Sequence, residues 1–101
     1  MGFGASGAGG AGSGGNWTGY SLTTNAVAGE ESSTAYGRLI PEILIINDGA
    51  SDIQFGFGVS TATASYTVKA GETLSISTLV HNTLYYKSTG TAVPFRVLII
   101  W

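Results

Sequence analysis

The chain has no cysteine and little charge. Four Lys and Arg and six Asp and Glu make up 10% of its 101 residues, whereas an ordinary globular domain carries about 25% charged residues. Without cysteine the chain has neither disulfides nor thiolate ligands for a metal. Its basic residues, Arg38, Lys69, Lys87 and Arg96, are spread along the sequence, and phosphate binding needs several cations on one surface. The sequence therefore predicts no nucleic-acid partner.

Long apolar runs are absent as well. No run approaches the ~20 residues that a membrane-spanning helix requires, and the N-terminus lacks the basic residues and apolar segment of a secretory signal peptide. Residues 1–6 (MGFGAS) match the N-myristoylation pattern. However, no nearby Lys, Arg or Cys supplies the second signal that stable anchoring needs. We expect no membrane partner, and whether Gly2 is acylated stays open.

Groups that could carry catalysis are few. The chain has one histidine, His81, and no G-x-S-x-G sequence. The adjacent carboxylates Glu30 and Glu31 point to opposite sides of an extended chain, which is unsuitable for an acid–base pair. The sequence therefore predicts that the protein is not an enzyme. For His81, at a strand end, we expect a local hydrogen bond.

Two sequence patterns resemble cofactor and metal sites. Residues 2–7 (GFGASG) and 7–12 (GAGGAG) match G-x-G-x-x-G, but a dinucleotide site needs a strand before the first glycine and a helix after the last. Asn47, Asp48 and Asp52 could offer oxygens to Ca²⁺, although these residue types are also favoured in Asx-type turns. We favour the turn, and predict no cofactor and no metal.

Glycine is concentrated at the start of the chain. Residues 1–15 hold eight of the sixteen glycines, with Phe3 as the one aromatic residue. Such a segment cannot bury enough apolar surface to offset its ordering entropy. We predict a Gly-rich N-terminal arm over residues 1–15 and a β-sandwich domain over residues 16–101.

Short runs rich in β-branched and aromatic residues, separated by turn clusters, fill the rest of the chain. We predict strands at residues 17–24, 36–46, 53–59, 65–68, 73–80, 83–88 and 92–101. Pro41 and Pro94 are expected at edges or bulges, because neither can donate a ladder hydrogen bond. The fold class is all-β: an antiparallel β-sandwich or jelly-roll-like barrel of about seven to eight strands. Strand order stays open.

Two kinds of strand differ in their apolar pattern. Residues 53–59 and 74–80 alternate, which is typical of a strand with one face in the core. Residues 43–46 and 97–101 are apolar on both faces, and no helix is available to cover them. We therefore predict a homo-oligomer, with subunit contacts made by Ile43, Leu44, Ile45, Ile46, Val97, Leu98, Ile99, Ile100 and Trp101.

Aromatic residues allow a different function. A platform that stacks on sugar rings could be built from Trp17, Tyr20, Tyr36, Tyr66, Tyr85, Tyr86 and Trp101. The alternative is that these side chains fill the core or subunit contacts, and we favour it.

Residues 39–101 carry several features in a recognisable order: an apolar strand ending in Asn (ILIIN), an aromatic-glycine strand (FGFG), a VKAGETL turn, an NTLYYKSTGT hairpin and a terminal FRVLIIW strand. In this the chain resembles small β-sandwich virion accessory proteins of tailed bacteriophages. The resemblance implies a capsid decoration (cement) protein that clusters on the capsid shell as a trimer and binds the major capsid protein or another virion protein. It carries over no catalytic residues.

The sequence thus leads to one main hypothesis: a virion structural protein that attaches to and stabilises the capsid. Attachment is predicted for the arm, through Gly2, Phe3, Gly4, Gly7, Gly10 and Gly15, because a chain without bulky side chains can run close to a neighbouring backbone. The alternatives are a phage tail, collar or fibre component, or a carbohydrate-binding β-sandwich module.

Overall fold

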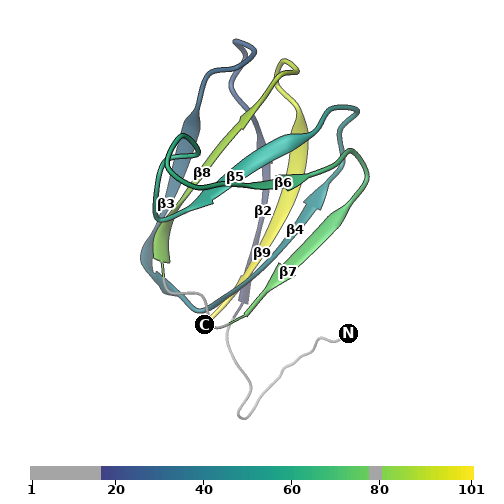
Figure 1. Cartoon of the computed structure of the whole chain (residues 1–101). Coiled ribbons are helices and arrows are strands. Elements are labelled where there is room, and N and C mark those ends of the chain that lie inside the picture. Colours follow the sequence, from purple (N-terminus) through teal and green to yellow (C-terminus); the bar gives the residue numbers. More distant parts are fainter. Residues whose placement is uncertain (1–16, 78–80) are drawn as a thin grey trace.

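The computed structural model describes residues 17–77 and 81–101 (Figure 1). These residues form strands without any helix: β2 (Trp17–Thr23), β3 (Ser32–Ile40), β4 (Glu42–Asn47), β5 (Ile53–Phe57), β6 (Tyr66–Val68), β7 (Thr73–Ile76), β8 (His81–Ser88) and β9 (Pro94–Ile100). The predicted all-β class is confirmed. No helix that could cross a membrane occurs in the described ranges.

The strands form two antiparallel sheets packed face to face (Figure 1). One sheet has the order β2-β9-β4-β7 and the other β3-β8-β5-β6. Successive strands mostly change sheet, so the first and last described strands, β2 and β9, become neighbours. This is the eight-stranded jelly-roll arrangement, which settles the strand order that the sequence left open.

The segment predicted as one strand, residues 36–46, is two strands in different sheets. β3 begins earlier than predicted, at Ser32, and ends at Ile40, and β4 starts at Glu42. Pro41 lies between them, where its missing N–H breaks the ladder and lets the chain cross from one sheet to the other. The prediction of one continuous strand was therefore wrong, although its proline marked the crossing point.

The core lies between the two sheets and is centred on aromatic rings. Phe95 of β9 meets Phe55 of β5 and Tyr86 of β8 edge-on, with ring centroids 5.1 and 5.0 Å apart. Edge-to-face packing suits the quadrupoles of the rings. Aliphatic side chains from both sheets surround this group, and those of Ile40, Ile43, Ile45, Ile53, Val68, Leu84, Val97 and Ile99 are buried.

The turn after β4 is held by one buried side chain. The Asn47 amide nitrogen donates to the carbonyl oxygens of Ser51 and Val68, both at 2.9 Å, and its oxygen accepts from the Gly49 N–H at 2.9 Å. The neighbouring Asp52 accepts a hydrogen bond from the Ala70 N–H at 3.2 Å. Asn47 therefore makes the Asx-type turn that the sequence favoured over a Ca²⁺ site.

Candidate assembly face

The face of the β2-β9-β4-β7 sheet that points away from the core is apolar in its middle, with Glu42 towards one end and Arg96 towards the other. Strand alternation places Leu44, Ile46, Leu98 and Ile100 on this face, each half-buried, beside Trp17, which is 57% exposed. The strand register brings them together, with Leu44 opposite Leu98 and Trp17 opposite Ile100. We call these five residues the outer stripe.

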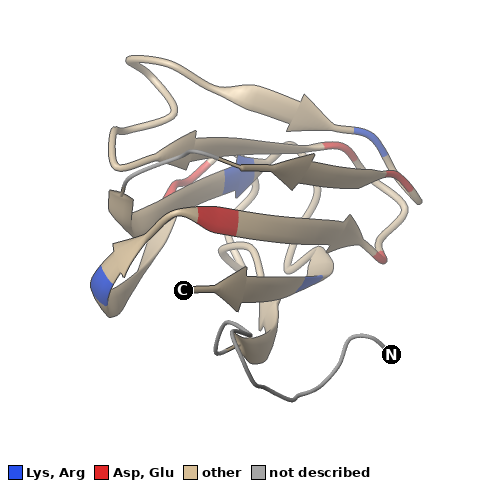
Figure 2. Cartoon of the chain, turned by 90° about the horizontal axis from the view of Figure 1, so that it is seen from below, with Lys and Arg blue, Asp and Glu red and all other residues tan. Residues whose placement is uncertain are grey.

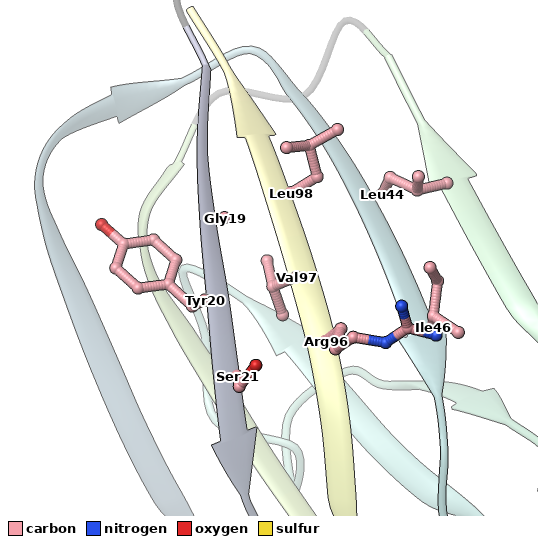
Figure 3. Close-up of a pocket in the computed structure, with 8 residues that line it drawn as sticks. All are labelled: Gly19, Tyr20, Ser21, Leu44, Ile46, Arg96, Val97 and Leu98. Atoms are coloured by element: carbon pink, nitrogen blue, oxygen red, sulfur yellow. The ribbon is translucent and has the colours of Figure 1, made fainter. Parts of the chain in front are cut away.

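A shallow groove of about 270 Å³ runs along the outer stripe (Figure 3). Its lining residues come from three adjacent strands: Gly19, Tyr20, Ser21, Leu44, Ile46, Arg96, Val97 and Leu98. Leu44 and Leu98 form its apolar wall, while β2 contributes the small residues Gly19 and Ser21. A side chain at position 19 would meet nothing closer than 4.0 Å. The groove therefore exists because β2 keeps small residues on this face.

An ion pair closes one end of the groove. The Arg96 guanidinium donates to both carboxylate oxygens of Asp48, at 2.8 and 2.9 Å. This contact lowers the pKa of the Asp48 carboxyl and raises that of Arg96. Because the pair is exposed to solvent, it contributes little to stability. The pair neutralises the charge of Arg96 where it borders the apolar surface.

The outer face of the other sheet is different. Its strands present Gln54 of β5 and Thr83 and Lys87 of β8, together with Tyr85. Charged residues are few and spread around the molecule (Figure 2). A loop over residues 58–65 folds back onto this face, and the Gly58 N–H donates to the Thr83 carbonyl at 2.9 Å. The molecule therefore has one apolar outer face and one polar, partly covered outer face.

The prediction for subunit contacts needs a correction. Ile43, Ile45, Val97 and Ile99 are buried in the core of this chain, with at most 2% exposed, because they occupy the inward positions of β4 and β9. They are therefore not available to a neighbouring subunit. Among the predicted residues, Leu44, Ile46, Leu98 and Ile100 lie on the outer stripe and keep their predicted role as a proposal.

Trp101 lies half-buried against the core, outside the outer stripe. The Arg38 guanidinium lies over its ring, 4.5 Å from the centroid, a cation–π contact within this chain. The predicted attachment residues of the arm, Gly2, Phe3, Gly4, Gly7, Gly10 and Gly15, lie outside the described residues, as does Val80 of the alternating strand.

The aromatic platform is not assembled. Tyr86 is 5% exposed in the core, and Tyr36 is half-buried against Tyr20, with ring centroids 6.2 Å apart. Trp17 and Tyr66 are exposed but belong to different sheets. Of the favoured interpretation, that these side chains fill the core or subunit contacts, packing in or against the core holds for Tyr20, Tyr36 and Tyr86.

The imidazole of His81 makes no hydrogen bond to a side chain or backbone group in the described ranges, contrary to the predicted local hydrogen bond. It is 4% exposed and lies edge-on between Tyr36 and Phe57, with centroids 5.6 and 5.5 Å away. Among the residues that the structure describes, neither ring nitrogen of His81 nor the Tyr36 hydroxyl has a hydrogen-bond partner. Burial lowers the pKa of His81, an effect that the Ile40 backbone opposes in part, and it raises the pKa of Tyr36. Burial in this aromatic enclosure therefore favours the neutral form of the imidazole.

The described ranges bring together no group of three or more His, Cys, Asp or Glu side chains that could hold a metal ion. Of the two adjacent glutamates, Glu31 faces the loop over residues 58–65. One of its oxygens accepts hydrogen bonds from the Thr61 hydroxyl, the Thr61 N–H and the Ser60 hydroxyl, at 2.6, 2.8 and 3.0 Å. The Thr61 hydroxyl makes the largest contribution to lowering the pKa of Glu31. Its carboxylate therefore fastens a loop.

No protein-family model matches this chain, and no curated protein matches it in sequence. Solved structures do share its fold. An HTH_3 family transcriptional regulator from Vibrio cholerae has a TM-score of 0.57 at 9% identity, over 84% of this chain and 43% of that chain. The Cupin_2 domain of an XRE family regulator from Enterobacter cloacae has a TM-score of 0.56 at 12% identity, over 84% and 81% of the two chains. This chain thus spans less than half of the Vibrio protein.

A third structure with this fold comes from Bacillus endospore appendages, which form disulfide-linked pili. Its TM-score is 0.55 at 14% identity, over 86% of this chain and 85% of that chain. At such identities the three likenesses show the fold alone. This chain has no cysteine, so any assembly that it forms is not linked by its own disulfides.

The fold corrects the prediction that the chain is not an enzyme. That prediction was drawn from the scarcity of catalytic groups in the sequence. The chain shares its fold with a cupin domain, and the jelly roll supports many unrelated functions, catalysis among them. The exclusion of enzyme activity was therefore wrong.

Proposed function

We propose that this chain is a structural subunit of a virion, a decoration protein that binds the capsid shell of a tailed phage and associates with copies of itself. The outer stripe is the observation that carries the proposal. It gathers Trp17, Leu44, Ile46, Leu98 and Ile100 on one face of one sheet, and no described element covers it. A contiguous group of partly exposed apolar side chains on a small domain is typical of an interaction site.

The distribution of charge supports contact with protein. The five residues of the outer stripe are uncharged, and the charges on the same face lie at its ends, with Glu42 opposite Ile100 and Arg96 paired with Asp48. Charged residues are depleted in the cores of protein interfaces, where aromatic residues and Arg are enriched. A face of this kind suits a lasting contact with another protein surface better than binding to a polyanion.

The N-terminal arm provides the test of capsid attachment. Deleting residues 2–15 should leave the β-sandwich folded, because these residues precede its first described strand at Trp17. The truncated and full-length proteins are added to purified particles that lack this protein, and bound protein is measured after sedimentation of the particles. We expect the truncated protein to keep its circular dichroism spectrum and melting temperature but not to bind. Particle loading equal to that of the full chain would contradict the proposal.

A second candidate is a subunit of a phage tail, collar or fibre. Supporting it, the same jelly roll occurs in the Bacillus endospore appendages, whose subunits form pili. The two candidates differ in the geometry of assembly, since closed contacts give rings and open contacts give filaments. Electron microscopy of the concentrated full-length protein separates them, because a tail or fibre subunit is expected to form extended polymers.

A further inference from the structure

The four edge strands of the sandwich differ in how well they are protected against pairing with another chain. β3 has a register shift between Ala35 and Ile40 with a positive φ of 80° at Gly37, and it carries Arg38. β6 has three residues, and β7 has four. Short strands, bulges and charged residues are the usual protections of exposed edges. Three edges therefore carry at least one protection.

β2 carries none of these protections. Its seven residues, Trp17–Thr23, have no charge and no proline. They pair with β9 in one unbroken register, from Trp17 opposite Ile100 to Thr23 opposite Pro94. Its other side has no described strand beside it. A long, regular and uncharged edge is a template for another strand.

Burial along β2 indicates that this edge is incomplete. Its inward residues Thr18, Tyr20 and Leu22 are only half-buried, whereas the inward residues Val97 and Ile99 of the neighbouring β9 are buried. The difference arises because none of the described strands flanks β2 on its outer side. The indole of Trp17, on the outer face, is also 57% exposed. An added strand would cover side chains on both faces of β2 at once.

We propose that β2 pairs antiparallel with β2 of a second copy of this chain, about a two-fold axis at Tyr20, so that two four-stranded sheets become one continuous sheet. With Tyr20 at the centre the whole strand overlaps, and Trp17 lies opposite Thr23 of the second copy. Gly19 lies opposite Ser21, so the small residues beside the groove meet and the two outer stripes join. This inference rests on the proposed structural function and names the self-contact that serves it.

The β2 edge of the second copy fits better than its β7 edge. Pairing with the four residues of β7 would leave nearly half of β2 uncovered. A contact between identical strands also closes on itself, and two-fold dimers are the commonest homo-oligomers. The contact therefore predicts a dimer in place of the trimer that the resemblance implies.

Molar mass in solution is the first test, with two matched variants of the full-length chain. Ser21→Lys and Ser75→Lys both place a lysine on an exposed outward position of an edge strand of the same sheet. In sedimentation equilibrium, the wild type should have twice the mass of one 10.3 kDa chain. Ser21→Lys should raise the dissociation constant by about tenfold or more, since a charge on the edge opposes pairing. Ser75→Lys should leave the constant unchanged.

Cross-linking then tests the register. The chain has no cysteine, so introduced thiols report without background. Cysteines at facing positions of paired strands lie within the Cα separation that a disulfide allows. A mixture of Gly19→Cys and Ser21→Cys should therefore oxidise to a covalent dimer, while each variant alone should not. A mixture of Gly19→Cys and Ser75→Cys should also stay monomeric on denaturing gels.

The outcomes separate the contact from the function. A monomeric wild type at high concentration, dissociation by Ser75→Lys alone, or a covalent dimer from the mixture of Gly19→Cys and Ser75→Cys would each overturn the β2 contact. None of these results changes the particle-loading test of residues 2–15. The β2 contact can therefore fail while capsid decoration stands, and loading by the truncated protein can refute decoration while the dimer persists.

Discussion

Gly56 of β5 is the position where the structure gives the sharpest prediction for stability, because a methyl group there has no room. A Cβ atom at position 56 would lie 2.1 Å from the carbonyl oxygen of Val59, 3.1 Å from the amide nitrogen of Thr61 and 3.2 Å from the carbonyl carbon of Ser60. All three are backbone atoms of the loop that folds back onto β5, so no side-chain rotation relieves the contact. Since close carbon–oxygen contacts lie at about 3.3 Å, Gly56→Ala forces the loop to move by about 1 Å.

The cost follows from what that movement disturbs. Overpacking of this kind costs about 1–3 kcal/mol. The displaced loop also loosens the hydrogen bonds of Thr61 to the Glu31 carboxylate, at 2.6 and 2.8 Å. Alanine offsets about 0.4–1 kcal/mol by restricting the unfolded chain. We therefore expect a net loss of about 2 kcal/mol in the free energy of unfolding, which for a domain of this size lowers the melting temperature by about 8–16 °C.

The assay is urea and thermal unfolding followed by circular dichroism, with Gly19→Ala as the matched control. A Cβ at position 19 meets nothing closer than 4.0 Å, from the Trp17 ring and the Val97 carbonyl, and the position is exposed. The control should therefore change the unfolding free energy by less than about 0.5 kcal/mol. If Gly56→Ala is as stable as this control, the close packing of the loop on β5 is refuted.

Two further predictions concern buried polar groups. The pKa of His81 is lowered from 6.5 by burial, so the unfolded state binds the proton more tightly. Stability should be complete above pH ~6.5 and fall as the pH drops below that value, and His81→Phe should remove this part of the pH dependence in urea titrations between pH 7 and 5. Asn47→Ala removes three hydrogen bonds and leaves the carbonyl of Val68 without this donor in a buried site, so we expect a loss of about 2–4 kcal/mol. Asn47→Ala unfolding at the same urea concentration as the wild type would contradict that account.

The local chemistry of the sequence predicted most strands but not their partners. The turn after β4 could be predicted because Asn and Asp side chains favour turns by hydrogen-bonding to the nearby backbone. The Asn47 side-chain oxygen accepts such a hydrogen bond from the Gly49 N–H. Strand order could not be predicted, because β2 pairs with β9 near the other end of the sequence. Nothing in residues 17–23 specifies so distant a partner. Pro41 was predicted at an edge or bulge, but it marks the end of a strand. Its missing N–H lies where the chain changes sheet.

The residues predicted for subunit contacts also depended on tertiary structure that the sequence does not show. An apolar run such as residues 43–46 reveals that both faces of a strand avoid water, but not which face this chain covers itself. That choice depends on the other sheet, which buries Ile43 and Ile45. For His81 the sequence showed a single histidine at a strand end. Its place between the rings of Tyr36 and Phe57, without a hydrogen-bond partner in the described part of the chain, depends on strands far away in sequence.

The few polar and charged side chains of this domain are unevenly divided between the two outer faces of the sandwich. A polar outer face with Gln54, Thr83 and Lys87 keeps one side compatible with water, so the other side can carry the outer stripe. Were both faces apolar, copies could stack without limit, whereas one apolar face with one open edge at β2 restricts contact to a single side. The asymmetry therefore favours association that is finite on the β2-β9-β4-β7 side and leaves the other sheet facing solvent. A charge introduced on that polar face, at Gln54, should accordingly leave the mass in solution unchanged.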